Sequence, residues 1–269
     1  YRHFWDSYSR QLKEGLASDP GAKDEILPLL RFYSSKSEEE LTSLKAYMER
    51  MSPDQDEIYY VLGESVQTVA LSPHLDPFRE RGLEVLFLID AIDPFITPLL
   101  SEYEDKKLRN VDDASIELPE VDDDEAVEQQ EEVLPEADFN RFIGRCVTTL
   151  GDRVIEVRES RVLRKSPVRL VAPEDAPGHD MDRLQRYFDK EYEVPKRILE
   201  VNRGHSLIAH LTQLVGQQPR DHLIELSINQ LYESALVMEG LHPNPAAMLP
   251  QIQQLLEIAA ALAIKPEAD

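Results

Sequence analysis

A stretch of the chain that lacks any basic residue constrains the fold most. Between Asn110 and Asn140 there is no Lys or Arg, while thirteen of the 52 acidic residues fall there. This stretch carries more than half of the formal net charge of −23, because the rest of the chain holds 29 basic and 39 acidic residues. Like charges in one run repel each other and keep the backbone extended. We therefore predict two domains, 1–111 and 137–269, joined by an acidic linker over 112–136.

Composition excludes several classes of function. The acidic excess argues against nucleic acid as a ligand, and the acidic run lacks the ligand spacing and Gly turn of a calcium loop, the alternative reading of so many carboxylates. Asp90 and Asp93 interrupt the most apolar stretch and no signal peptide is visible, so we expect no membrane partner. A single cysteine, Cys146, fits a reducing cytoplasm and a core position better than a nucleophile. The chain opens at Tyr1 without Met, so we expect a fragment of a longer protein.

Hydrophobic periodicity predicts a small α/β first domain. Residues 57–62 and 83–89 have the composition of buried strands, and 65–81 between them provides a helical crossover, which makes the two strands parallel. We predict three layers, αβα, around a short parallel sheet. The other expected elements are helices over 4–16 (with Phe4, Tyr8, Leu12 and Leu16 on one face), 23–33, 43–51 and 93–103, and an edge strand over 108–111.

The second domain is predicted to be mixed α+β. Its clearest feature is the amphipathic helix from Phe139 to Leu150, which Gly151 ends. The remaining expected elements are strands over 154–157, 168–171 and 198–201, and helices over 181–191, 206–215, 221–240 and 244–264.

The last two helices carry apolar stripes too wide for the pair to bury on each other. They are expected to form a helical dimerisation bundle with the same pair of a second copy, which makes the chain a homodimer. The alternative is one more helical layer in a monomer's core. The residues predicted to carry dimerisation are Ile228, Leu231, Ala235, Leu236, Ile252, Leu255 and Leu256.

Motifs for catalysis are mostly missing from the sequence. It contains no Gly-rich phosphate loop, no HExxH and no CxxC, so we assign no catalytic, cofactor-binding or metal-binding residues. Gly63-Glu64-Ser65 resembles a nucleophile elbow, but Gln67 replaces the second glycine, and a strand-end turn is the simpler interpretation. A nucleotide-binding α/β enzyme domain, with its ligand near Gly63, remains the alternative function.

Apolar residues in polar surroundings suggest a binding surface. Met181, Leu184, Tyr187 and Phe188 follow helical spacing in a long polar loop, which suits contact with varied apolar partners. Phe95, just after Pro94 at a helix start, is either a core anchor or an exposed contact. If these side chains are internal, the chain is a structural adaptor that binds no client.

Five motifs together resemble the ninety-kilodalton heat-shock protein chaperones, and the bacterial members in particular, because the eukaryotic Met-Glu-Glu-Val-Asp tail is missing. They are Leu29-Leu30-Arg31-Phe32, Ile58-Tyr59-Tyr60-Val61-Leu62-Gly63-Glu64-Ser65, Ser72-Pro73-His74-Leu75, Leu199-Glu200-Val201-Asn202 with His205, and Leu231-Tyr232-Glu233-Ser234-Ala235-Leu236-Val237.

This resemblance implies the end of a middle domain followed by a C-terminal dimerisation domain. ATP and Mg then bind the parent protein outside this chain, so the fragment itself has no cofactor and no ATPase activity. It also implies unfolded or partly folded client proteins as partners, contacted through Phe95, Met181, Leu184, Tyr187 and Phe188. Two positions depart from the family pattern, which often has Trp at Phe95 and has Pro at Arg203.

Overall fold

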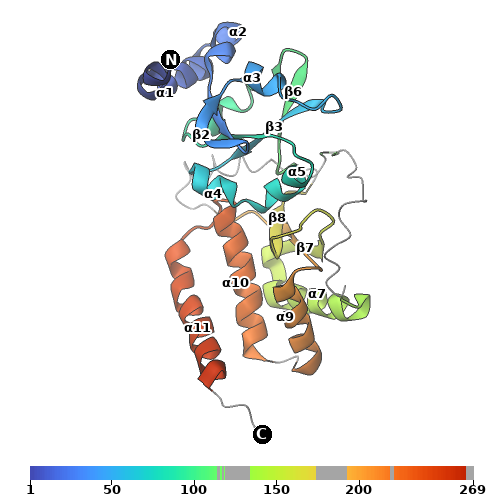
Figure 1. The fold of residues 1–269 in the computed structure, drawn as a ribbon. Coiled ribbons are helices and arrows are strands. Elements are labelled where there is room, and N and C mark those ends of the chain that lie inside the picture. Colours follow the sequence, from blue (N-terminus) through green and yellow to red (C-terminus); the bar gives the residue numbers. More distant parts are fainter. Residues whose placement is uncertain (114–115, 117, 119–133, 174–192, 219–220, 265–269) are drawn as a thin grey trace. The chain divides into compact units, whose positions relative to one another are not determined.

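The computed structural model describes residues 1–113, 116, 118, 134–173, 193–218 and 221–264. The chain divides into two compact units, drawn in Figure 1. Unit 1 comprises Tyr1–Asp123 with Ala172–Tyr192, and unit 2 comprises Asp124–Val171 with Glu193–Asp269. Each has hydrophobic clusters made of its own residues. Among the described residues, none of the helices has the length and apolar character to cross a membrane.

Unit 1 is built around a mixed sheet. Its described strands are β1 (Phe32–Ser34), β2 (Ser37–Thr42), β3 (Glu57–Leu62), β4 (Val85–Leu88), β5 (Glu102–Tyr103) and β6 (Lys106–Asn110). They lie in the order β2-β1-β4-β3-β6-β5. The predicted parallel pairing of β3 with β4 is confirmed, and β6 also pairs parallel with β3, while β1, β2 and β5 add antiparallel pairs. The short parallel sheet expected from the sequence is therefore the centre of a larger mixed one.

Side chains on β3 alternate between two cores, as the pleat of a strand requires. Ile58 and Tyr60 pack into a cluster that includes Trp5, whereas Tyr59 and Val61 pack into a second cluster that includes Phe78. Both faces of the sheet are covered, which explains why β3 is an unbroken apolar run. The three-layer αβα prediction is confirmed.

Short helices surround this sheet. They are α1 (Arg2–Ser18), η1 (Pro20–Ala22), α2 (Lys23–Ile26), η2 (Leu27–Leu29), α3 (Leu44–Met48), α4 (Val66–Ala70), η3 (Pro73–Leu75), α5 (Asp76–Glu80) and α6 (Asp93–Ile96). Serines cap several of them, as Ser43 does by accepting a hydrogen bond from the Ala46 N–H at 3.1 Å.

Three predictions for unit 1 were wrong in detail. The helix expected over 23–33 stops near Pro28, which has no N–H to donate, and Phe32 instead begins β1. The helix expected over 93–103 ends after Ile96, because Glu102–Tyr103 pairs with β6. The strand expected over 108–111 is flanked on both sides, by β3 and β5, and so lies inside the sheet.

The orientation predicted for α1 was right for Leu12 and Leu16 but wrong for Phe4 and Tyr8. Phe4 and Tyr8 are exposed, and the buried face carries Trp5, Lys13 and Leu16. A strict four-residue step drifts around a helix of 3.6 residues per turn, so the stripe that begins at Phe4 cannot stay on one face over four turns. The face that begins at Trp5 reaches the core instead and brings a lysine with it.

Unit 2 combines a small sheet with long helices. Its described strands are β7 (Val154–Glu159), β8 (Val168–Val171) and β9 (Arg197–Val201), in the order β7-β9-β8, with β7 parallel and β8 antiparallel to β9. Its described helices are α7 (Glu136–Leu150), η5 (Gly151–Arg153), α9 (Ser206–Gln217), α10 (His222–Met238), η6 (Pro245–Met248) and α11 (Leu249–Ile264). The predicted mixed α+β class is confirmed.

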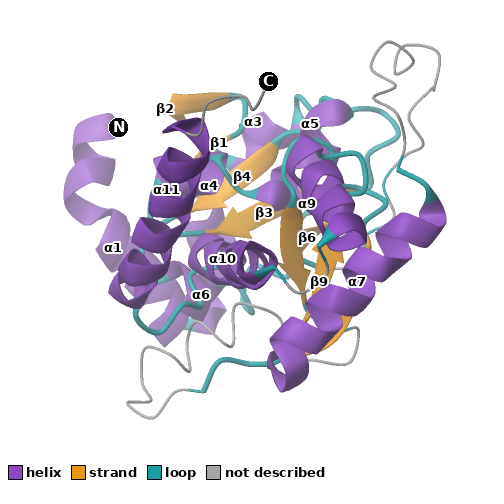
Figure 2. Ribbon diagram, turned by 90° about the horizontal axis from the view of Figure 1, so that it is seen from below, coloured by secondary structure: helices purple, strands orange, loops and turns teal. Residues whose placement is uncertain are grey.

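The core of unit 2 lies between the sheet and the helices α7, α9 and α10. Gly151 ends α7 with a φ of 57°, a conformation that disfavours side chains, as the sequence suggested. Helices α10 and α11 run side by side (Figures 1 and 2), joined by the Gln251 side-chain N–H, which donates to the Leu226 carbonyl at 2.8 Å. The terminal pair predicted from periodicity is therefore present as two adjacent helices.

Candidate functional site

Phe95 lies on the four-residue helix α6, directly after Pro94, where the chain leaves β4. Its side chain is half-buried, whereas Ile96 and Leu100 are fully inside the core of unit 1. The sequence left Phe95 as either a core anchor or an exposed contact, and its intermediate burial does not decide between the two. Its role in contacting client proteins stays a prediction.

A buried lysine holds the start of α6. Lys13 Nζ lies 2.6 Å from Asp93 Oδ1, and it also forms an ion pair with Asp90. The side chains of Lys13 and Asp93 are only 2% and 0% exposed. The ammonium lies 5.7 Å from the ring centroid of Trp5 and 5.4 Å from that of Phe32, within cation–π range. Helix α1, strand β1 and helix α6 therefore meet at one charge.

Two carboxylates share this ammonium, and Asp93 is the more buried of the two. The Asp90 N–H donates to Asp93 Oδ2 at 2.9 Å, so Asp93 also closes the turn that begins α6. Burial raises the pKa of the Asp93 carboxyl, and the opposing effect of Lys13 does not cancel that shift. The sequence interpretation missed this cluster. The signal was present, since Lys13 follows Trp5 by eight residues and precedes Leu16 by three, on one helical face.

The other predicted client-binding residues, Met181, Leu184, Tyr187 and Phe188, lie outside the described residues. Their part in client binding therefore stays a prediction.

The predicted dimerisation residues fall into two groups. Four residues on α10 are buried in the core of unit 2: Ile228, Leu231, Ala235 and Leu236. On α11, Ile252 and Leu255 are half-buried and Leu256 is exposed. The α10 residues pack within their own chain, so only α11 offers side chains of this set to a partner. Dimerisation itself stays a prediction.

Helix α11 presents an apolar surface. Leu249, Leu256 and Leu262 are 57%, 64% and 56% exposed, and Glu257 is the only charged residue of the helix. Exposed apolar patches on soluble domains commonly mark interaction sites. The sequence found the helix but not which of its leucines face outward.

The family motif around Asn202 has a structural role in unit 2. The Asn202 side-chain amide donates to the carbonyls of Arg164 and Ser166 at 3.0 and 3.1 Å, and so holds the β7–β8 loop. Arg203, at the position where the family has Pro, donates through Nε to the Leu134 carbonyl at 2.9 Å. The departure from the family pattern thus ties β9 to the start of α7.

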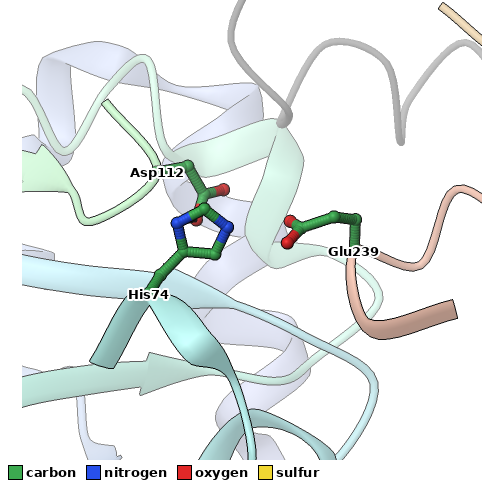
Figure 3. Close-up of side chains that lie close together, drawn as sticks. All are labelled: His74, Asp112 and Glu239. Carbon is green, nitrogen blue, oxygen red and sulfur yellow. Dashed lines mark ion pairs between the residues drawn. The ribbon is translucent and has the colours of Figure 1, made fainter. Parts of the chain in front are cut away.

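Figure 3 draws His74, Asp112 and Glu239. In unit 1, His74 Nδ1 lies 3.9 Å from Asp112 Oδ1, a separation that allows an ion pair only when the histidine is protonated. Glu239 belongs to unit 2, so it is not counted with them. Two ligands are too few for a protein zinc or calcium site, and we assign no metal to this pair. Asp112 is the first residue of the predicted acidic linker, yet it is buried next to His74 in unit 1.

The residues that could have supported an enzyme have structural roles. Ser65 caps α4 by accepting a hydrogen bond from the Thr68 N–H at 3.1 Å. A side chain on Gly63 would approach Val69 to 2.1 Å, so glycine is required there for packing. Burial raises the pKa of Cys146 to about 12, which keeps it a thiol. These observations do not favour the nucleotide-binding alternative.

Comparison with known proteins supports one family throughout. The family model described as Hsp90 protein matches residues 1–269. The chain is 35% identical over 260 residues to the chaperone protein HtpG of Chlorobium luteolum, covering 96% of this chain and 41% of that protein. It is 38% identical over 262 residues to HtpG of Halorhodospira halophila, covering 95% and 40%.

The relative from Nitrosococcus oceani, also named chaperone protein HtpG, is 34% identical over 259 residues and is matched over 40% of its length. The chain therefore spans about two fifths of these relatives. Its position within a longer protein stays a prediction from the motifs. The match over the whole chain shows that this protein belongs to the Hsp90 family.

Proposed function

We propose that this chain is part of a molecular chaperone, in which it supplies the homodimerisation surface and part of the surface that binds unfolded clients. Support comes from family membership, from the names of its relatives and from the exposed leucines of α11. The observation that carries the proposal is the apolar face of α11. In this proposal the chain represents the end of a middle domain with a C-terminal domain, hydrolyses no ATP itself, and works in the cytoplasm.

A second copy is the partner proposed for α11. Two α10–α11 pairs related by a two-fold axis would form a four-helix bundle. A standard interface buries about 800 Å² on each partner, and each leucine moved out of water contributes roughly 1.5–3 kcal/mol. In this arrangement Leu231 and Leu236 of α10 stay in the core of their own unit, and α11, linked to α10 by the hydrogen bond from Gln251 to the Leu226 carbonyl, makes the contact with the second copy.

The test is the solution mass of the variant Leu256→Glu with Leu262→Glu, measured by light scattering at high micromolar concentration. We expect wild type to be a dimer and the variant a monomer with unchanged circular dichroism. Val147→Glu is the matched control, because Val147 is also an exposed apolar residue on a helix of unit 2. A wild-type monomer, or a variant that stays dimeric, would reject this assignment. Leu231→Glu is unsuitable, since it buries a charge in the core.

Client contact at Phe95 needs a separate experiment. We expect Phe95→Ala to weaken binding of a carboxymethylated, permanently unfolded protein by about 1–2 kcal/mol, measured by fluorescence anisotropy. Phe4→Ala is the control, because Phe4 is an exposed aromatic residue on α1, away from the α6 turn in sequence. Equal affinity of wild type and Phe95→Ala would favour the adaptor alternative.

A further inference from the structure

Lys13 is an unusual residue to find inside the core of unit 1. A buried charge is costly unless it is paired, and an apolar side chain of similar length would fill the same space. The Lys13 ammonium instead lies within cation–π range of the rings of Trp5 and Phe32 and forms ion pairs with Asp90 and Asp93. The charge therefore has a directional partner, which an apolar residue would lack.

Asp90 and Asp93, the partners of Lys13, form the turn at which α6 begins. Helix α6 has four residues, and an isolated helix of that length is not stable in water. The conformational entropy lost in forming its first turn exceeds the free energy gained from so few hydrogen bonds. The α6 turn is held at one end by Asp93, which forms an ion pair with Lys13 and accepts a hydrogen bond from the Asp90 N–H. At the other end Ile96 and Leu100 are buried. Phe95 lies between these two attachments.

The ion pair between Lys13 and Asp93 joins α6 to helix α1, which carries Lys13. This helix spans 17 residues, and Lys13 lies on its buried face with Trp5 and Leu16. Short ion pairs in a dry environment tolerate little change in geometry, so a displacement of α1 changes the position of Asp93. Asp90, by contrast, is half-exposed, which leaves one side of the pair accessible to water.

We propose that Lys13 is a positioning residue for client contact: through Asp90 and Asp93 it couples helix α1 to helix α6, and so sets how Phe95 is presented. This inference rests on the proposed client-binding role of Phe95. Movement of α1 then changes client affinity without any contact between α1 and the client.

The test uses three variants of the whole chain. Lys13→Met removes the charge and keeps the length of the side chain. Lys13→Met with Asp93→Asn removes the charges of Lys13 and Asp93, leaves the half-exposed Asp90 and keeps an acceptor for the Asp90 N–H. Arg10→Met is the control, because Arg10 lies on the same helix and pairs with Glu14 at the surface.

Two readouts separate positioning from general stability. Hydrogen exchange is measured at Thr97 and Leu100, whose N–H groups donate to the carbonyls of Asp93 and Ile96 at 3.1 and 2.9 Å. The amides of β3 serve as the internal reference. Client affinity is measured with the same unfolded protein as for Phe95→Ala.

For Lys13→Met we expect exchange in α6 to accelerate at least about tenfold relative to β3, with client affinity reduced about threefold or more. The double variant should stay within about twofold of Lys13→Met in both values, because it also lacks the ion pairs that join α1 to α6. A return of both values to those of wild type would overturn the coupling, since it would show that only an unpaired buried carboxylate had mattered. Unchanged exchange in Lys13→Met, or equal acceleration in α6 and β3, would overturn the coupling. If Phe95→Ala leaves client affinity unchanged, the proposed client role fails, while exchange still reports whether Lys13 holds α6.

Discussion

The two units each contain a buried ion cluster, and the two clusters have opposite compositions. In unit 1 one cation, Lys13, serves two carboxylates. In unit 2 one carboxylate, Glu200, serves two guanidinium groups: Arg158 Nη2 donates to Oε1 and Arg169 Nε donates to Oε2, both at 2.8 Å. The clusters differ in the ratio of their charges and in burial, since the Asp93 side chain is 0% exposed and that of Glu200 is 8% exposed.

The pKa shifts of the two central carboxylates have opposite directions, because burial and the number of cationic partners both differ. Burial by itself raises the pKa of Glu200, but the arginines outweigh it and the pKa is lowered. Burial also raises the pKa of Asp93, and there a single shared lysine does not reverse the shift. A fully compensated carboxylate stabilises its unit as an anion, whereas an under-compensated one holds its charge at a cost.

The largest effect is expected from Glu200→Gln. The substitution leaves two guanidinium groups facing a neutral amide, and it weakens the links among β7, β8 and β9. We expect a loss of about 3–5 kcal/mol in the free energy of unfolding of unit 2, measured by urea titration. Lys13→Met should cost less in unit 1, because Asp93 can take up a proton. A larger loss from Lys13→Met would break the comparison.

The response to acid should differ in sign between the units. Glu200 has a folded-state pKa below its ordinary value of 4.5, so its contribution is fully present above that value and is lost as pH falls through the folded pKa. Asp93 has a folded-state pKa above its ordinary value of 3.8, so the cost of its charge is present at neutral pH and disappears as pH falls through the folded pKa.

The measured quantity is the free energy of unfolding of wild type minus that of the variant at each pH. The contributions of the other carboxylates are the same in both proteins and drop out of this difference. Fluorescence of Trp5, the single tryptophan, follows unit 1, and hydrogen exchange in β9 follows unit 2. As pH falls from neutral through the raised folded-state pKa of Asp93, wild type should gain stability relative to Asp93→Asn. Below the ordinary value for Glu200, Glu200→Gln should lose its disadvantage. Parallel slopes for the two variants would contradict the opposite shifts.

The smallest effects concern the two arginines of unit 2. The side chain of Arg169 is 11% exposed, and that of Arg158 is 41% exposed. We expect Arg158→Met to cost less than about 1 kcal/mol, as exposed ion pairs do, and Arg169→Met to cost about 1.5–3 kcal/mol, as hydrogen bonds to charged groups do. Urea titration of both variants decides the order. Equal losses would show that exposure does not separate the two contacts.

Local pattern in the sequence was sufficient for much of the fold. The strand β3 was predicted residue for residue, β4 to within two residues at its start and one at its end, and the parallel pairing followed from the crossover between them. Helices α7, α10 and α11 followed from apolar periodicity and from Gly151. These features depend on residues close together in the chain, where spacing and backbone preference act directly.

Tertiary structure alone decided which surfaces matter. Helices α10 and α11 have similar apolar patterns, yet the predicted dimerisation residues of α10 are buried in the core, while Leu249, Leu256 and Leu262 of α11 are exposed. Helical spacing placed Lys13 on one face with Trp5 and Leu16, but the pairing could not be predicted because its partner Asp90 is 77 residues away. Periodicity identifies the face of a helix that is apolar, but what covers that face, and which distant charge meets which, depends on contacts that form only when the chain has folded.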